Sequence, residues 1–290
     1  MPKLTAPRGA RKKPKLGQHF LTDQAAATRI VEGLGEVWQQ TVLEIGPGRG
    51  VITSLLAQRA RRVIAIELDR VLAAQLRMKF ANAPNVEIIE GDIVAIDFNT
   101  LFGPKPGATR PGLTITPEAV RVVGNLPYYI TSQILLHLFE FRQYFSIMVI
   151  MVQREVADRI AAPPGGRDYG LLSATAQLYA NVEKLFTLPP EVFAPPPKVH
   201  STVLRLTMAP KLEKLHVPED GFVDFLKQSF GLKRKTLWNN LKPRYDADTL
   251  KAALNDAGVN RNLRAEALSL EKSAALYRAL AAGSATGTEG

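Results

Sequence analysis

The sequence of 290 residues lacks cysteine and any long apolar run. Without cysteine the chain has neither disulfides nor thiolate metal sites. Its histidines do not have metal-ligand spacing: His19, His137, His200 and His216. The apolar stretch at 147–152 is far shorter than the roughly 20 residues that a membrane-spanning helix needs, and the amino terminus lacks the apolar segment of a signal peptide. We therefore expect no metal site, no membrane span and a cytoplasmic protein.

Positive charge, in contrast, is in excess. The formal net charge is +10, which favours a polyanionic partner because Lys and Arg gain affinity by displacing counterions from phosphates. The segment before Asp23 contains only basic charges, among them Lys12, Lys13 and Lys15. This segment either binds nucleic acid or is a solvated tail that keeps the protein soluble. The tail by itself does not decide between the two.

Apolar runs with the length of strands alternate with helical patterns before residue 210, which predicts an α/β domain. The predicted strands are 41–45, 62–66, 86–89, 120–123, 147–152, 183–188 and 201–207. A helix is expected from Asp23, its cap, to about Leu34, and another from Thr131 or Ser132 as its cap. Residues 103–118, rich in Pro and Gly, are expected to form a surface loop.

The chain changes character near residue 210. From Pro218 onward, short amphipathic helices replace strands, so we expect a small all-α domain that follows a larger α/β domain. Within it, Lys233, Arg234 and Lys235 belong to a basic cluster around Trp238, a combination suited to nucleic acid. The last eight residues, 283–290, are expected to be a flexible tail.

Three successive predicted strands end in residues that suit a nucleoside. The first runs into the loop 46–50, Gly-Pro-Gly-Arg-Gly, where glycines let a ligand approach the backbone and a helix amino terminus offers N–H groups. The second ends at Glu67, about 20 residues beyond the first glycine, where a carboxylate can accept both ribose hydroxyls. The third ends before Asp92, which can accept from an adenine amine. Together they favour an adenosine-type ligand, although the glycine spacing is not that of dinucleotide oxidoreductases.

The fourth strand leads into the turn Asn125-Leu126-Pro127-Tyr128. An amide, a carbonyl next to a residue without an N–H and an aromatic ring then lie within four residues. Such a turn can hold a flat ring that carries an amine, or it can be a turn for conformational reasons alone.

Two other segments have alternative interpretations. Residues 15–21 mix apolar anchors with polar groups, and form either a hydrophobic staple or a lid over a ligand. The proline-rich connection 189–200 is stiff and is expected to display Phe193, whose alternative role is that of a packing anchor.

Taken together, these motifs resemble the ribosomal RNA adenine dimethyltransferases, which modify two adjacent adenines near the end of small-subunit ribosomal RNA. The resemblance rests on KLGQHFL at 15–21, LEIGPGRG at 43–50, ELD at 67–69, GD at 91–92, GNLPYYIT at 124–131, QREVA at 153–157, FAPPPKVHS at 193–201, KRKTLWNNL at 233–241 and LRAEALSL at 263–270. It implies a Rossmann-like class I methyltransferase domain with a mixed, mostly parallel sheet. The implied domains are a basic tail and lid at 1–22, the methyltransferase domain at 23–210, a helical RNA-binding domain at 211–282 and the tail at 283–290.

The resemblance also implies S-adenosylmethionine as the methyl donor. His19 and Leu21 would cover this cofactor, Gly46 would face its methionine end, Glu67 would hold the ribose and Asp92 the adenine amine. His19 departs from the asparagine that is common in the family at this place, so its specific hydrogen bond stays open.

For the reaction, the resemblance implies methyl transfer to the exocyclic amine of a target adenine. Asn125, itself also beside the cofactor, and the carbonyl of Leu126 would accept the two amine hydrogens, with Pro127 shaping the turn. Tyr128 and Phe193 would stack on the two faces of the extruded base. The basic tail residues and Lys233, Arg234 and Lys235 would contact RNA.

The implied partner is small-subunit ribosomal RNA in a pre-assembled particle, and the protein would act as a monomer in ribosome maturation. Two alternatives remain: a large-subunit adenine methyltransferase of the macrolide-resistance type, and a non-catalytic RNA-binding assembly factor. The number of methyl groups added and the role of residues 103–118 stay open.

Overall fold

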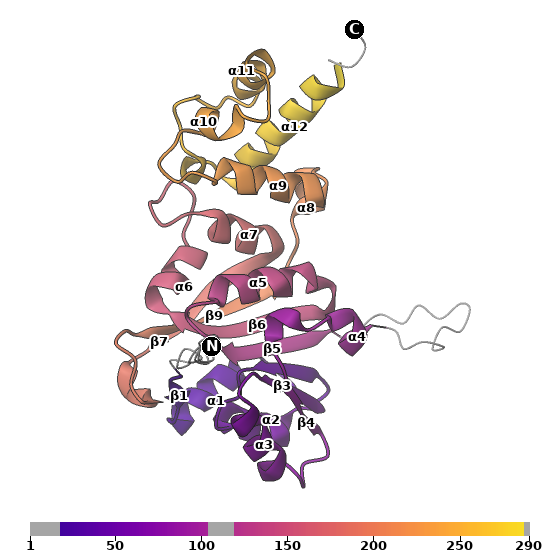
Figure 1. Ribbon diagram of the computed structural model, residues 1–290, viewed down its shortest axis with the longest axis vertical. Coiled ribbons are helices and arrows are strands. Elements are labelled where there is room, and N and C mark those ends of the chain that lie inside the picture. Colours follow the sequence, from indigo (N-terminus) through magenta and orange to yellow (C-terminus); the bar gives the residue numbers. More distant parts are fainter. Residues whose placement is uncertain (1–17, 104–118, 287–290) are drawn as a thin grey trace, which may run out of the picture.

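The computed structural model describes residues 18–103 and 119–286 and contains a seven-stranded sheet (Figure 1). The strand order is β4-β3-β2-β5-β6-β9-β7. The strands are β2 Thr41–Ile45, β3 Arg62–Glu67, β4 Val86–Glu90, β5 Val120–Asn125, β6 Phe145–Gln153, β7 Ala180–Leu188 and β9 Ser201–Met208. Lys12, Lys13 and Lys15, and the expected loop beyond Gly103, lie outside the described residues.

The strands from β4 to β6 are all parallel, and β9 is antiparallel to both of its neighbours, β6 and β7. The expected mixed, mostly parallel sheet is therefore confirmed. In the register, Ile45 of β2 lies between Ile66 of β3 and Gly124 of β5, so these strands end at the same edge. Every residue of β2 is buried, as expected for a central strand covered on both faces.

Successive residues of each strand point to opposite sides of the sheet, so both faces carry apolar side chains. Helices cover both faces. They are α1 Gln24–Glu32, α2 Val51–Arg59, α3 Arg70–Lys79, α4 Phe98–Phe102, α5 Thr131–Glu140, α6 Arg154–Ile160 and α7 Leu171–Tyr179. Val42 packs in one buried cluster, with α1 and α2, whereas Leu43 packs in the other, with α5.

One expected helix cap is confirmed and one is wrong. The Asp23 carboxylate accepts the Ala26 N–H at 2.6 Å and caps α1. At α5, however, the cap position is Ile130, which has no side-chain hydrogen bond. The Thr131 hydroxyl instead donates to the carbonyl oxygen of Pro127 at 3.0 Å, so it braces the preceding turn rather than the helix.

Beyond β9 the described chain is helical, as expected. These helices are α8 Leu212–Leu215, α9 Glu219–Ser229, α10 Leu237–Leu241, α11 Ala247–Asp256 and α12 Leu270–Thr286. The tail expected from residue 283 was placed too early, because α12 continues to Thr286. Among the described helices, none combines the length and apolarity needed to cross a bilayer.

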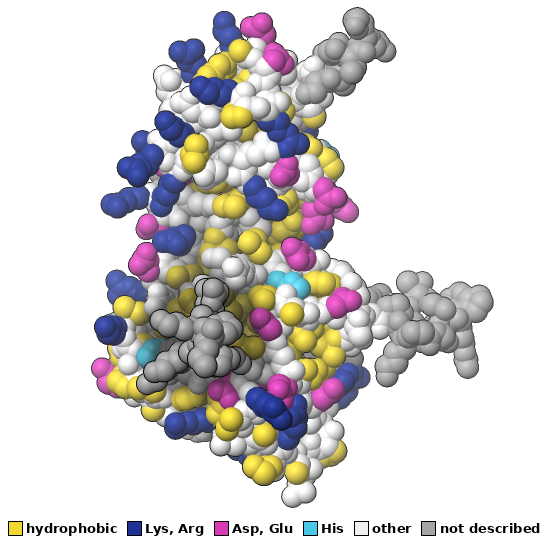
Figure 2. Space-filling view, viewed as in Figure 1, with side chains coloured by type: hydrophobic (Ala, Val, Ile, Leu, Met, Phe, Trp, Pro, Cys, Tyr) yellow, Lys and Arg dark blue, Asp and Glu magenta, His cyan; other side chains and the backbone are white. Residues whose placement is uncertain are grey.

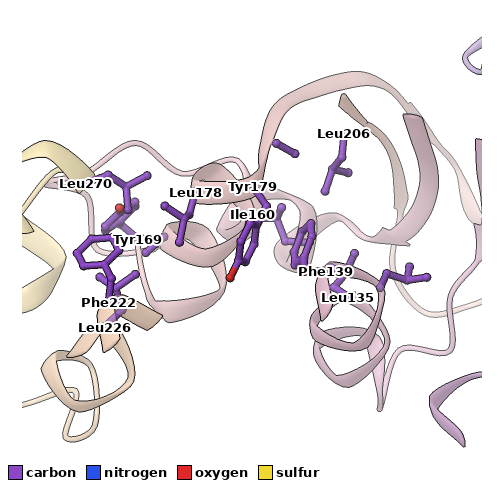
Figure 3. Close-up of a cluster of buried hydrophobic side chains, with 14 of the residues drawn as sticks. Leu135, Phe139, Ile160, Tyr169, Leu178, Tyr179, Leu206, Phe222, Leu226 and Leu270 are labelled. Atoms are coloured by element: carbon purple, nitrogen blue, oxygen red, sulfur yellow. The ribbon is translucent and has the colours of Figure 1, made fainter. Parts of the chain in front are cut away.

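The helical part and the α/β part share one hydrophobic core. The helical part lies at one end of the long axis, on the side of α7 (Figure 1). A single buried cluster contains Phe139 of α5, Leu178 and Tyr179 of α7, and Phe222 and Leu226 of α9 (Figure 3). The expected change from strands to short helices near residue 210 is therefore a change of architecture within one continuous core.

A polar contact reinforces this junction. Glu219, at the start of α9, accepts from the Arg142 guanidinium and from the Tyr179 hydroxyl, the latter at 2.9 Å. The guanidinium carbon of Arg142 also lies 4.7 Å from the centre of the Tyr179 ring. Burial and the Glu219 carboxylate together raise the pKa of Tyr179, so the phenol remains a donor.

Candidate active site

A pocket opens at the carboxyl ends of β2, β3, β4 and β5, where the strand order reverses between β2 and β5. Open α/β sheets bind ligands at such a point. The pocket brings together all the cofactor-binding residues predicted from the sequence: His19, Leu21, Gly46, Glu67, Asp92 and Asn125. Leu126, Pro127 and Tyr128 also line it.

The glycine loop after β2 is shaped for close approach. Gly46, Gly48 and Gly50 have φ angles of 65°, 56° and 75°, in the left-handed region that favours glycine. A Cβ on Gly48 would lie 2.8 Å from the Phe20 ring. Gly50 precedes α2 and has no side chain that could cap the first-turn N–H groups of this helix.

Both carboxylates that are predicted to bind the nucleoside are oriented by backbone N–H groups. Glu67 is 4% exposed, and its oxygens accept the N–H of Gly48 at 3.0 Å and of Asp69 at 2.9 Å. Asp92 accepts the N–H of Val94 at 3.1 Å. Each carboxylate has lone pairs left for a ligand, because an ionised carboxylate offers about four acceptor positions.

The sequence interpretation missed Glu44, which also lines the pocket. It lies within an apolar strand and is 2% exposed. Burial, with a smaller contribution from the charge of Glu67, raises its pKa to about 7. A charged residue inside a short apolar run next to a glycine loop is the signal that could have identified it.

The segment before α1 lies along the pocket as a short strand. β1 Phe20–Leu21 pairs antiparallel with β8 Phe193–Ala194. His19 Nδ1 lies 2.7 Å from the Pro195 carbonyl oxygen. The Arg49 guanidinium lies 4.8 Å from the centre of the Phe20 ring. His19, Phe20 and Leu21 thus form a wall of the pocket, held by the chain that follows β7.

Asn125 and Tyr128 are held in fixed orientations at this pocket. The Asn125 side-chain amide donates to the His19 carbonyl oxygen at 3.0 Å, which leaves Oδ1 as the acceptor. The Tyr128 hydroxyl lies 2.8 Å from the Ser201 hydroxyl of β9. The Tyr128 ring stacks with the His19 ring, with centroids 6.1 Å apart and planes at 26°.

The expectation that Phe193 is displayed from a loop is wrong. Its ring is 3% exposed and packs in the buried cluster that contains Leu21 and Val203. The physical reason is the pairing of β8 with β1, which turns the ring inward beside Leu21. Phe193 is a packing anchor here and does not line the pocket.

The basic cluster of the helical part is exposed. Lys233, Arg234 and Lys235 lie between α9 and α10, and all three are exposed. Nearby, the Arg261 guanidinium lies 6.0 Å from the Trp238 ring. Figure 2 shows Lys and Arg side chains gathered along one edge of the helical part and continuing toward the α/β part.

Several known proteins have similar sequences. The ribosomal RNA adenine dimethylase family matches residues 9–282. Ribosomal RNA small subunit methyltransferase A of Koribacter versatilis is 57% identical over 285 residues, which cover 98% of this chain and 100% of that protein. The protein of the same name from Acidobacterium capsulatum is 54% identical over 92% of this chain and 91% of its own length.

Solved structures give the same fold. A dimethyladenosine transferase from Plasmodium falciparum has a TM-score of 0.71 at 22% identity, over 92% of this chain and 98% of that one. The 23S rRNA methyltransferase ErmE has a TM-score of 0.64 at 27% identity, over 90% of this chain and 99% of that one. Because the family match and the relative with 57% identity both span almost the whole sequence, the chain belongs to the ribosomal RNA adenine dimethylase family.

Proposed function

We propose that this protein dimethylates the N6 amines of two adjacent adenines near the 3′ end of small-subunit ribosomal RNA. Family membership makes it an S-adenosylmethionine-dependent methyltransferase of ribosomal RNA adenines, as the resemblance implied. The observation that carries the site assignment is the position of Asn125, whose oriented amide lies at the edge of the nucleoside pocket.

The residues of the pocket fit S-adenosylmethionine. Bound there, this cofactor would supply a methyl group on a sulfonium. The loop that begins at Gly46 would receive the methionine end, Glu67 the ribose hydroxyls and Asp92 the adenine amine. His19 and Leu21 would cover the cofactor. The left-handed glycines and the free acceptor positions of both carboxylates support these roles.

The catalytic turn would activate the target amine without a strong base. An exocyclic adenine amine is a poor nucleophile because its lone pair is delocalised into the ring. If Asn125 Oδ1 and the Leu126 carbonyl accept its two hydrogens, the nitrogen can become pyramidal and direct its lone pair at the methyl group. Pro127, without an N–H, leaves that carbonyl free of a competing neighbouring donor.

Two aromatic residues are proposed to hold the extruded adenine. Tyr128 would stack on one face, with its ring position fixed by Ser201. Phe193 would stack on the other face only after leaving its buried position, since its ring is 3% exposed. The structure therefore supports the role of Tyr128 more directly.

The proposed partner is ribosomal RNA within a pre-assembled small-subunit particle, bound by a monomer in the cytoplasm. The exposed Lys233, Arg234 and Lys235 and the net charge of +10 support contacts to phosphates, to which Lys12, Lys13 and Lys15 would add. The small-subunit assignment follows from the 57% identity to a protein of that name, against 27% to ErmE, which supports the large-subunit alternative.

Labelled S-adenosylmethionine, incubated with unmodified small or large ribosomal subunits, tests the substrate. We expect label on small-subunit adenines, and label only on the large subunit would overturn the assignment.

Asn125→Ala should lower methyl transfer about 100-fold or more, by analogy with the loss of one transition-state hydrogen bond, with S-adenosylmethionine binding largely intact. Asn181→Ala, at an exposed position on β7, is the control. Full turnover by Asn125→Ala would refute the catalytic role, and a wild type that binds particles without methylating them would favour the assembly factor.

A further inference from the structure

Glu44 is a buried carboxylate with an incomplete set of partners. It is 2% exposed and lines the pocket, yet its Oε2 has no hydrogen-bond partner. Burial of an ionised carboxylate without partners is strongly unfavourable, and such a group normally takes up a proton. Glu67 differs, since each of its oxygens accepts a backbone N–H.

The groups around Glu44 do not supply a matching positive charge. On β3, the Glu67 carboxylate is negative, and Asp92 after β4 adds a further carboxylate to the pocket. On α3, Lys79 is the cation whose charge acts on Glu44, but its Nζ donates to the carbonyl oxygens of Arg49 and Gly50 at 3.1 and 3.2 Å.

Two further groups face Glu44 or the same pocket. On α2, Thr53 lies beside Glu44 and favours its ionised form, but neither Glu44 Oε2 nor the Thr53 hydroxyl has a hydrogen-bond partner. The Arg49 guanidinium lies over the Phe20 ring, 4.8 Å from its centre. The pocket thus holds more negative than positive groups, and the pKa of Glu44 is raised to about 7.

We propose that Glu44 is protonated while the pocket is empty and releases this proton when a fixed positive charge of the methyl donor occupies the pocket. The carboxylic O–H bond breaks, the proton passes to the buffer, and the new carboxylate faces the sulfonium or the ammonium of S-adenosylmethionine. Glu44 would then make binding selective for a cationic ligand. This inference rests on the proposed function and adds a proton to the binding equilibrium of its cofactor.

Isothermal titration calorimetry in phosphate and in Tris measures this proton, because the two buffers have different heats of ionisation. At pH 6.5, a carboxyl group with a pKa of about 7 is mostly protonated, so wild-type protein should release roughly three quarters of a proton per S-adenosylmethionine bound. Affinity should rise about fivefold between pH 6 and pH 7. Glu44→Gln, which keeps the size of the side chain, should release none and show a flatter pH dependence.

Two ligand analogues show which positive charge of S-adenosylmethionine the Glu44 carboxylate faces. Methylthioadenosine has no fixed positive charge and should bind without proton release. S-adenosylhomocysteine keeps the ammonium but lacks the sulfonium, so release with this ligand assigns the ammonium as the partner, and its absence assigns the sulfonium.

Two control variants keep the test decisive. Thr53→Val changes a neighbour of Glu44 on α2 but retains the carboxyl group, so proton release should persist. Glu87→Gln makes the same chemical change at an exposed residue paired with Arg62, and should leave release unchanged. If Glu44→Gln fails to fold, the comparison of S-adenosylmethionine with methylthioadenosine on wild-type protein still tests the proposal.

Equal heats in both buffers for a wild-type protein that methylates RNA would overturn this inference and leave the proposed function standing. Undiminished proton release on ligand binding by folded Glu44→Gln would also overturn this inference and leave the proposed function standing. Absence of any S-adenosylmethionine binding would overturn the proposed function and this inference together.

Discussion

At the scale of single residues, the pocket depends on positions where even a methyl group does not fit. Gly48 combines a φ of 56° with a Cβ position 2.8 Å from the Phe20 ring, and its N–H is a donor to Glu67. This glycine therefore links the loop, the β1 wall and the Glu67 carboxylate, which is proposed to bind the ribose. A change here alters three parts of the site at once.

Gly48→Ala should weaken S-adenosylmethionine binding by about tenfold or more, because the backbone strain of about 1 kcal/mol is joined by displacement of Phe20. Calorimetric titration measures the affinity, and thermal unfolding measures the backbone contribution. Gly165→Ala is the matched control, since Gly165 also has a positive φ, of 90°, but no atom lies within 4 Å of its added Cβ. Equal losses of affinity in both variants would contradict the role of the Phe20 contact.

At the scale of elements, the wall of the pocket is a sheet of two short strands, β1 and β8. An isolated pair of strands is marginally stable in water, so this one depends on the burial of Leu21 and Phe193. Its stability and the position of Phe193 are therefore coupled. Any role of that ring in base stacking competes with its role in holding the wall.

Two substitutions separate these roles. Phe193→Ala should cost about 3 kcal/mol of unfolding free energy by leaving a cavity, whereas Phe193→Leu should cost less than about 1.5 kcal/mol. If the ring also stacks on adenine, Phe193→Leu should keep the stability and the affinity for S-adenosylmethionine but lose methyl transfer. Urea unfolding and single-turnover methylation measure the two effects. Full activity of Phe193→Leu would show that Phe193 acts in packing and not in base stacking.

The sequence predicts those elements that are determined by residues close together in the chain. β2 and β6 are mostly apolar runs with the length of strands, and the Asp23 cap acts within three residues, so both kinds of feature are visible in the sequence. β1 and β8 contain two residues each and exist only because they pair over a separation of more than 170 residues. Because this pairing is not visible in the sequence, Phe193 was predicted to be displayed from a loop.

The site was predicted to a similar degree. Glu67, Asp92 and Asn125 follow strands of a parallel sheet, and such strand ends necessarily meet at one edge. The apolar run around Glu44 marks this residue as unusual in the sequence, but its burial and the lack of a partner for Oε2 arise only in the folded protein.

At the scale of the whole molecule, the exposed basic cluster and the pocket belong to one folded unit. The buried side chains of α7 and α9 connect the two parts (Figure 3). The contact between Arg142 and Glu219 adds a polar connection. RNA bound at Lys233, Arg234 and Lys235 would therefore be held in a defined position relative to the pocket.

Simultaneous reversal of Lys233, Arg234 and Lys235 to Glu should weaken binding to the small-subunit particle and reduce its dependence on salt, by about 0.7–0.9 in the log–log slope for each phosphate that the variant no longer neutralises. Binding of S-adenosylmethionine should not change. Filter binding at several salt concentrations provides the slope. Lys251→Glu, at an exposed position on α11, is compared with Lys233→Glu alone, because each of these single reversals changes the net charge by two. An unchanged slope in the triple variant would show that these residues do not bind phosphates.

The shared core between α7 and α9 has a geometric consequence for substrate choice. Because the junction contains large buried side chains and not an extended linker, the span from the basic cluster to Asn125 is set by the fold. If RNA binds at the basic cluster, the enzyme would modify the adenines that lie at a fixed distance from that contact. Shifting the anchor point along the RNA by one nucleotide would shift the methylated adenine with it.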